Sequence, residues 1–142
     1  MQVIGFNFKK IQAEKKNLSK DKLTIDSNVN IQNISEEKIE AVKDKPVLKF
    51  DFNFTVNYKP DVAEIKLQGM VLLMVEKDQS KMIFKKWKNK EVLEEIRVPL
   101  FNLILTKCNL KAMMLEEELS LPTHIPLPRI KPQQNNNTNY TG

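Results

Sequence analysis

The chain has few of the residues on which common enzyme and cofactor sites depend. Its 142 residues include three glycines, one cysteine and one histidine. With glycine only at positions 5, 69 and 142, neither the Rossmann nor the Walker phosphate loop can be written. The single Cys108 excludes an intrachain disulfide and a multi-cysteine zinc site, and the single His124 excludes a cluster of several histidines. We therefore expect no catalytic residue, no metal and no cofactor.

The chain also lacks a long apolar run, and its first residues do not have the pattern of a secretory signal. Its longest apolar stretch, residues 70–75, is far shorter than the roughly 20 residues that span a bilayer, and residues 1–10 contain no apolar h-region. We expect a cytoplasmic protein without membrane insertion. The net charge is +5, and most of the excess lies in residues 1–22, where six lysines face two carboxylates. Such a surface suits nucleic acid or acidic clients, although solvated lysines are the simpler interpretation.

What the chain has in quantity is alternation of apolar and polar residues, which predicts strands. The first strand, over residues 4–13, changes phase at Lys9-Lys10, which indicates a β-bulge. The second covers residues 23–32. The third and fourth cover residues 48–58 and 63–75 and are joined by turn-forming residues around Pro60. The charged stretch 35–45 is interpreted as a loop.

Helical spacing follows the strands. A short helix over residues 80–87 is expected to begin at Ser80, and Asn89 is expected to cap a long helix whose apolar residues recur at three- and four-residue steps. Pro99 either kinks this helix or begins it anew, and Leu121-Pro122 ends it.

Prolines and asparagines dominate the remainder of the chain. Residues 121–130 alternate prolines with apolar side chains and predict an extended segment that lies along the surface. Residues 132–142 contain no charge and predict a disordered, Asn-rich tail after one domain over residues 1–131.

The reactive side chains receive structural rather than catalytic interpretations. Cys108 falls on the apolar face of the long helix and is expected to pack there. His124 is expected to be an exposed loop histidine, and residues 116–118, all glutamates, a solvated helix face. Trp87, among lysines, could stack a nucleic-acid base, but its spacing from Ile83 favours a packing anchor.

The unusual feature is surplus apolar surface. Met70, Leu72 and Met74 occupy the face of the fourth strand that should be solvated, and Met113-Met114 lie near the end of the long helix. Methionine is flexible and polarizable, so a surface rich in it adapts to varied partners. A large exposed apolar area marks an interface. Either a homo-oligomer contact or a client groove explains it, and both can hold.

The order of elements resembles that of the export chaperone SecB and the SecB-like chaperones over roughly residues 1–131. The similarity lies in the order and spacing of the elements and in their pattern of apolar and polar residues. Its pieces are residues 3–11 and 23–28 for the first two strands, 47–58 and 63–75 for the long hairpin, 98–102 for a proline-containing helix entry, and 119–122 with 125–127 for a proline-rich exit.

The resemblance implies an α+β fold. It consists of a four-stranded antiparallel sheet with a long, kinked C-terminal helix on one face, assembled as a dimer or as the family's usual homotetramer. We place the dimer seam at the first strands. The implied function is that of an ATP-independent holdase, which binds unfolded, newly made or preprotein chains in apolar grooves for protein transport and translocation. Some family members instead protect the antitoxin of a toxin–antitoxin pair.

The chain departs from SecB in two ways, because it is basic and its C-terminal residues carry no acidic group. Both departures argue against handover to a SecA-type motor. A nucleic-acid-binding module that uses the N-terminal lysines and the Trp87 stretch, and a purely structural oligomer subunit, remain as alternatives. The predicted client-binding residues are Met82, Ile83, Phe84 and Trp87 in a crossover wall, Met113, Met114 and Leu119 on the helix, and Leu121 and Ile125 in the exit, with Met70, Leu72 and Met74 as further lining or a subunit interface.

Overall fold

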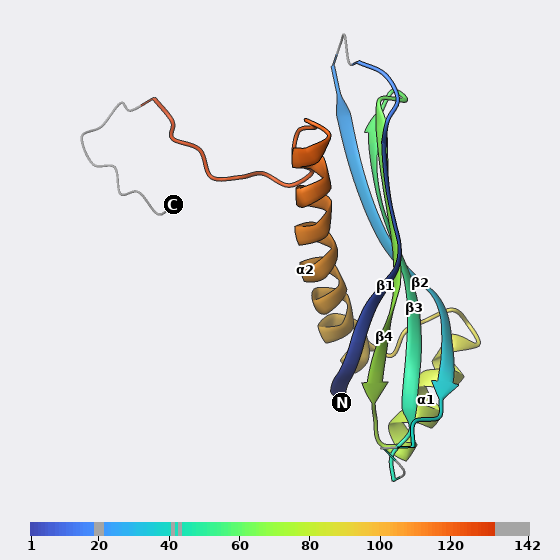
Figure 1. Cartoon of the computed structure of the whole chain (residues 1–142). Helices are drawn as coiled ribbons and strands as arrows, with labels where there is room; N and C mark the ends of the chain where they lie inside the picture. Colours follow the sequence, from blue (N-terminus) through green and yellow to red (C-terminus); the bar gives the residue numbers. More distant parts are fainter. Residues whose placement is uncertain (19–21, 41, 43, 133–142) are drawn as a thin grey trace.

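The computed structural model describes residues 1–18, 22–40, 42 and 44–132. One antiparallel sheet contains β1 (Gln2–Lys15), β2 (Thr24–Glu37), β3 (Val47–Lys59) and β4 (Ala63–Met74) in the order β1-β4-β3-β2. Two helices follow, α1 (Lys77–Trp87) and α2 (Glu94–Glu118). The long strands twist so strongly that they cross in Figure 1. This arrangement confirms the predicted α+β class, with four antiparallel strands and a long C-terminal helix.

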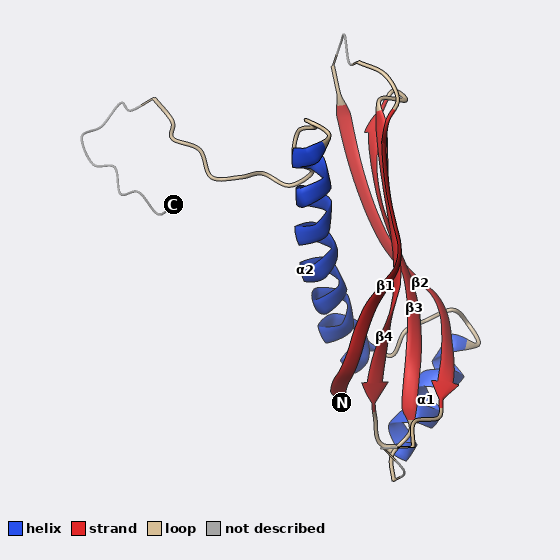
Figure 2. Cartoon of the chain, viewed as in Figure 1, coloured by secondary structure: helices blue, strands red, loops and turns tan. Residues whose placement is uncertain are grey.

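The hairpin of β3 and β4 forms the centre of the molecule. Alternate residues of both strands point to one face, here called the inner face, where nearly all are fully buried. Helix α1 lies at the end of the sheet where β4 ends, and α2 runs back along the strands toward the β3–β4 turn (Figure 2). A single apolar core therefore lies between the inner face and the two helices, contributed chiefly by Leu48, Phe50, Phe52, Phe54, Ile65, Leu67, Val71, Leu73, Ile83, Ile96, Leu100 and Ile104.

The edge strands differ from the prediction in length and register. In β1 the register with β4 shifts between Phe8 and Lys10, which confirms the predicted bulge, and shifts again between Val3 and Gly5. Strand β2 continues to Glu37, so the interpretation of residues 35–45 as a loop is wrong for its first part. Ile34 pairs with Phe50 and is buried, which extends the strand beyond the point where its polar residues suggested an end. Residues 41 and 43 of the same stretch lie outside the described residues.

Both helices begin at positions that the capping prediction missed. Helix α1 starts after Glu76, and Ser80 is buried inside it instead of capping it. Helix α2 starts after Leu93 instead of Asn89, and neither helix has a side-chain cap hydrogen bond. Tertiary packing therefore sets these boundaries. In α2 the packing is done by residues four apart, which are Ile96, Leu100, Ile104, Cys108, Ala112 and Glu116. The helix continues through Pro99.

The exit segment divides into two parts. Residues 121–125 tuck against the sheet, with Leu121 buried, whereas residues 126–132 are exposed and run away from the fold (Figure 1). The prediction that the whole segment lies along the surface is therefore wrong for its second part. The predicted disordered tail lies outside the described residues apart from Pro132. Among the helices that the structure describes, none is long and apolar enough to cross a membrane.

Gly69 is the position at which the sheet tolerates no side chain. It pairs with Phe8 on one neighbouring strand and with Phe52 on the other. The Phe52 ring stacks on Phe6 with centroids 5.3 Å apart and meets Phe8 edge-on at 6.3 Å. A Cβ at Gly69 would lie 2.6 Å from a Phe52 ring carbon and would also collide with the Asn7 carbonyl. The glycine thus makes room for the aromatic cluster that joins β1 to the central hairpin.

We expect Gly69→Ala to lower the free energy of unfolding by about 2–3 kcal/mol, because the new methyl group overpacks a site walled by backbone. Gly5→Ala is the matched control. Its Cβ would meet only the Leu72 side chain, at 3.2 Å, which can shift, so a change within about 0.5 kcal/mol is expected. Urea denaturation of both variants measures the difference. Equal stabilities would contradict the packing argument.

Candidate functional site

A groove of about 440 Å³ lies where the second edge strand meets the two helices. Its apolar lining comes from β2, the last residue of α1, the α1–α2 connection and the first half of α2, and consists of Val29, Ile31, Trp87, Val92 and Phe101. Because β2 pairs only with β3, one row of its backbone hydrogen-bonding groups is free of any described strand. The groove therefore combines aromatic side chains with an open strand edge.

Charged side chains surround this groove and cover its aromatic rings. The Lys90 ammonium lies 4.7 Å from the centre of the Trp87 ring, and the Arg97 guanidinium 5.8 Å from that of Phe101. Glu94 holds Arg97 through a contact of 3.5 Å. Since both rings are already covered by cations on one face, an incoming segment meets their edges and remaining surfaces. This arrangement is less suited to stacking a base than an open aromatic platform is.

The predicted crossover wall does not form one surface. Ile83 is fully buried in the core and is thereby removed from the wall. Met82 is exposed, while Phe84 and Trp87 are half-buried and pack against the core. Of these four residues, only Trp87 lines the groove. Helical periodicity had not distinguished the residues that face the sheet from those beside it.

The predicted helix side and exit lie away from the groove. The groove touches α2 at Phe101, and the twelve residues from there to Met113 span about 18 Å of helix. Met114 is exposed, Met113 and Leu119 are half-buried, and Ile125 is half-buried. Leu121 is buried in the core, so it offers little surface to a client. The fold therefore separates the predicted helix side and exit from the groove.

Met70, Leu72 and Met74 lie on the outer face of the sheet, away from the helices, and all three are half-buried. Their pairing partners on β3 include Asp51, opposite Met70, and Lys49, opposite Leu72. The structure thus keeps these methionines and Leu72 as surface residues, apart from both the groove and the core.

A row of exposed residues runs along the outward side of α2, and the sequence analysis singled out only Met114 among them. Val98, Leu110 and Met114 are each more than half exposed, and Asn102 and Thr106 continue the same four-residue spacing between them. Together these five residues are called the outer row. The opposite side of the helix is the buried row in the core. A helix with apolar residues on opposite sides is typical of one that is enclosed in an assembly.

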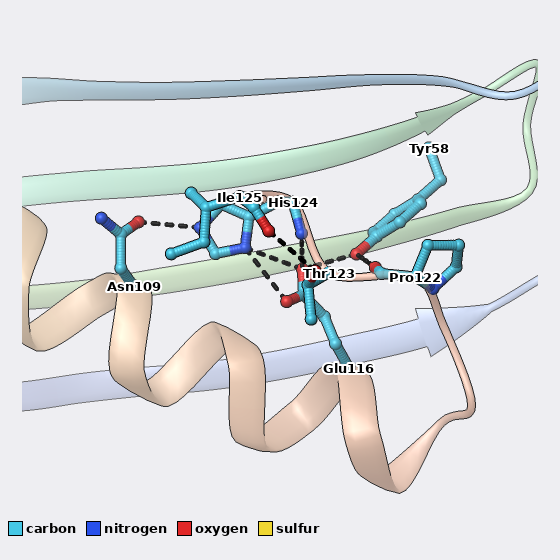
Figure 3. Close-up of polar contacts among 7 residues, drawn as sticks. All are labelled: Tyr58, Asn109, Glu116, Pro122, Thr123, His124 and Ile125. Atoms are coloured by element: carbon cyan, nitrogen blue, oxygen red, sulfur yellow. Dashed lines mark hydrogen bonds and ion pairs between the residues drawn. The ribbon is translucent and has the colours of Figure 1, made fainter. Parts of the chain in front are cut away.

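The largest correction concerns Glu116 and His124. Both were predicted to be solvated, yet their side chains are 0% and 1% exposed, and Nδ1 of His124 lies 2.9 Å from the Glu116 carboxylate. Tyr58 of β3 donates to the same carboxylate at 2.5 Å, and Asn109 lies 2.8 Å from the other ring nitrogen of His124 (Figure 3). These four residues are called the buried polar cluster. The helical spacing of Glu116 from Ala112 and Cys108 was the sequence signal that places it on the buried side.

Burial also shifts the acidity of two groups near this region. Desolvation, with the hydrogen bond and the charge of Glu116, raises the pKa of Tyr58 far above its usual range, so the phenol stays protonated and donates. Desolvation alone raises the pKa of Cys108 to about 12. Cys108 is therefore an inert packing residue, as its place on the helix predicted.

The N-terminal lysines are partly engaged within the chain. Lys9 pairs with Asp51 at 3.1 Å, Lys16 pairs with Asp61 at 3.4 Å, and Lys15 donates to the Leu119 carbonyl at 3.2 Å. Lys20, also counted in the basic N-terminal segment, lies outside the described residues. In the described part of the chain, no three residues of metal-ligating type gather.

Comparison of the sequence with protein-family models finds no match, and comparison with curated proteins finds none either. Comparison of the structure with solved structures finds a SecB-like chaperone from Mycobacterium tuberculosis in complex with a ChAD peptide from the HigA1 antitoxin. The TM-score is 0.54 at 14% sequence identity, over 94% of this chain and 92% of that one. The fold of this chain is therefore SecB-like.

The raised pKa of Cys108 leads to a prediction about the reactivity of its thiol. Because the folded chain holds the thiol pKa at about 12, against about 8.5 for a free cysteine, only a trace of thiolate exists at pH 8. We expect a chromogenic disulfide reagent to label the native protein at least about 100-fold more slowly than the urea-unfolded protein. Rapid stoichiometric labelling of the native chain would contradict the buried placement.

Proposed function

We propose that the protein is an ATP-independent chaperone of the holdase type that binds unfolded or newly made polypeptides. The aromatic groove beside the open edge of β2 is the observation that carries this proposal. The SecB-like fold supports it, since a protein of that fold was solved with a bound antitoxin peptide. The activity needs surface alone, and no reactive group of the chain takes part.

Binding would combine two contributions. Apolar client side chains gain roughly 25 cal/mol for each Å² that they bury against Trp87, Phe101 and their neighbours. An extended client backbone can also add to the free edge of β2 by main-chain hydrogen bonds, which do not depend on client sequence. Many weak contacts of this kind give the low sequence specificity that a holdase needs.

Assembly belongs to the same proposal. The outer row of α2 and the open edge of β1 are both available in the single chain, and we propose that they form the contacts of a dimer or homotetramer. Met70, Leu72 and Met74 on the outer sheet face remain a candidate client lining or subunit contact, as do Met82, Phe84, Met113, Leu119 and Ile125 for clients. We place the protein in the cytoplasm.

Two client classes fit this surface. One is a dedicated partner such as an antitoxin, for which the neighbour's bound peptide is a parallel. The other is a range of unfolded chains, including export preproteins. The basic charge of the chain argues against a SecA-type motor as the recipient. A nucleic-acid-binding role is less well supported, because Lys90 covers Trp87 and three of the N-terminal lysines, Lys9, Lys15 and Lys16, have partners within the chain.

We expect the protein, without ATP, to suppress aggregation of a chemically unfolded substrate at stoichiometric ratios, as followed by light scattering. Trp87→Ala should weaken suppression severalfold because it removes the main wall of the groove. Leu18→Ala is the control and should act as wild type, because Leu18 is 78% exposed and belongs to neither the groove nor a candidate client lining. Suppression should also persist at high salt, whereas a phosphate-binding surface would lose affinity steeply. No suppression at stoichiometric excess would refute the chaperone proposal.

If the outer row is a contact between subunits, a charge placed in it should change the oligomeric state. We expect Leu110→Asp to convert the assembly to smaller species, because a charge would be buried at the contact between helices. Leu127→Asp is the control, since Leu127 has similar exposure, 53% against 56%, but lies on the segment that leaves the fold. Light scattering coupled to gel filtration measures the mass. A wild-type monomer, or a Leu110→Asp variant of unchanged mass, would contradict this use of the outer row.

A further inference from the structure

We propose that the buried polar cluster is a protonation-controlled latch. It holds residues 121–125 over the inner face of the sheet while the His124 ring carries two protons, and it releases them when the ring loses one. Release would uncover apolar sheet surface next to α2. This last consequence rests on the proposed chaperone function, but the latch itself does not.

Glu116 is the centre of the latch. Its carboxylate accepts hydrogen bonds from the Tyr58 hydroxyl at 2.5 Å, from the His124 backbone N–H at 3.2 Å and from Nδ1 of the His124 ring at 2.9 Å (Figure 3). Two of these three donors belong to a residue of the exit segment. The Tyr58 hydroxyl also lies 2.6 Å from the Pro122 carbonyl, which ties a third group of the segment to β3.

The surroundings of the His124 ring favour its doubly protonated form. Nδ1 faces both oxygens of Glu116, at 3.0 and 2.9 Å, and Nε2 faces the Asn109 side-chain oxygen at 2.8 Å. Both nitrogens thus face acceptors, and only the imidazolium donates from both. A neutral ring has a single N–H, so one of these contacts would then join two acceptors unless the Asn109 amide turned over.

Charge balance leads to the same assignment. Glu116 is completely buried, and within the described residues His124 is its only ion-pair partner. A buried carboxylate without a cation is strongly disfavoured. The other groups that face the ring supply no charge, because Tyr58 stays protonated and Phe54 meets the ring edge-on at 5.9 Å. Lys15 approaches this end of α2 from β1, but it is exposed and binds the Leu119 carbonyl.

The latch also marks the point where the chain leaves the fold. Leu121 is buried beside it, residues 123–125 are half-buried, and all residues from 126 to 132 are exposed. The hydrogen bonds of Pro122 and His124 run to Tyr58, Glu116 and Asn109 of the cluster, and Phe54 packs edge-on against the His124 ring. Beneath these residues lie Tyr58 and Phe54 of the inner face, which would become accessible if the segment detached.

His124 is the single histidine of the chain, so NMR of the 15N-labelled ring reports on the latch without ambiguity. While both ring nitrogens carry protons, we expect the amide signals of Thr123 and Ile125 to be those of a docked segment. As the pH is raised until the ring loses one proton, we expect the docked amide signals to be lost with that proton.

Two variants separate the latch from general stability. Glu116→Gln removes the charge and should abolish the pH dependence of the Thr123 and Ile125 signals. Thr123→Val removes only a hydroxyl that donates to the Ile125 carbonyl at 2.7 Å, and should keep that pH dependence. The proposal is overturned if the docked segment holds a ring with one proton, or if docking persists unchanged while the ring loses its proton. Both observations use the wild-type protein, so they stand even if Glu116→Gln fails to fold.

The readout is also independent of chaperone activity. If the latch titrates as expected but the protein suppresses no aggregation, the chaperone proposal fails and the latch remains. If suppression is observed while the segment stays docked at every pH, the latch proposal fails and the chaperone proposal remains. If both are observed, we expect suppression to increase severalfold across the loss of the ring proton in wild type and to be flat with pH in Glu116→Gln.

Discussion

The apolar inner face of β3 and β4 must be covered along its whole length, and the rest of the structure follows from this requirement. The two strands are 13 and 12 residues long and nearly every inner residue is fully buried. One helix cannot cover such a twisted face, so α1 takes the end where β4 stops and α2 the remainder. The exit segment fills the corner near the hairpin turn. Each of these elements contributes to the same core.

Covering one face with two helices leaves other apolar surfaces open. The groove of Trp87 and Phe101 lies where α1 ends and α2 begins to cover the sheet, and it borders the free edge of β2. The outer row of α2 has no cover because the helix forms a single layer on the sheet. Because the helices cover only one face of the sheet, the groove and the outer row stay open to partners, whether these are copies of the chain or unfolded polypeptides.

Near its C-terminal end, α2 places a carboxylate where its earlier turns place apolar side chains. Glu116 continues the row of Ile104, Cys108 and Ala112, and a charge at that position must find donors and a counter-charge inside the protein. Tyr58 comes from β3 and His124 from eight residues further along the chain. The cost of burying one charge thereby ties the hairpin, the helix and the exit segment together at one point.

The sequence alone determined the elements whose residues carry their own periodicity. The alternation in β3 and β4, the bulge at Lys9-Lys10 and the apolar helix containing Cys108 were all predicted, because local burial patterns recur at two or at three to four residues. The SecB-like order of elements was also visible in it. Contacts between residues far apart in the chain were not visible. Only the tertiary structure decided that Ile83 faces inward, that Ser80 and Asn89 cap nothing, and that Glu116 meets His124, because packing against the sheet outweighs local capping preference and selects which side of each helix is buried.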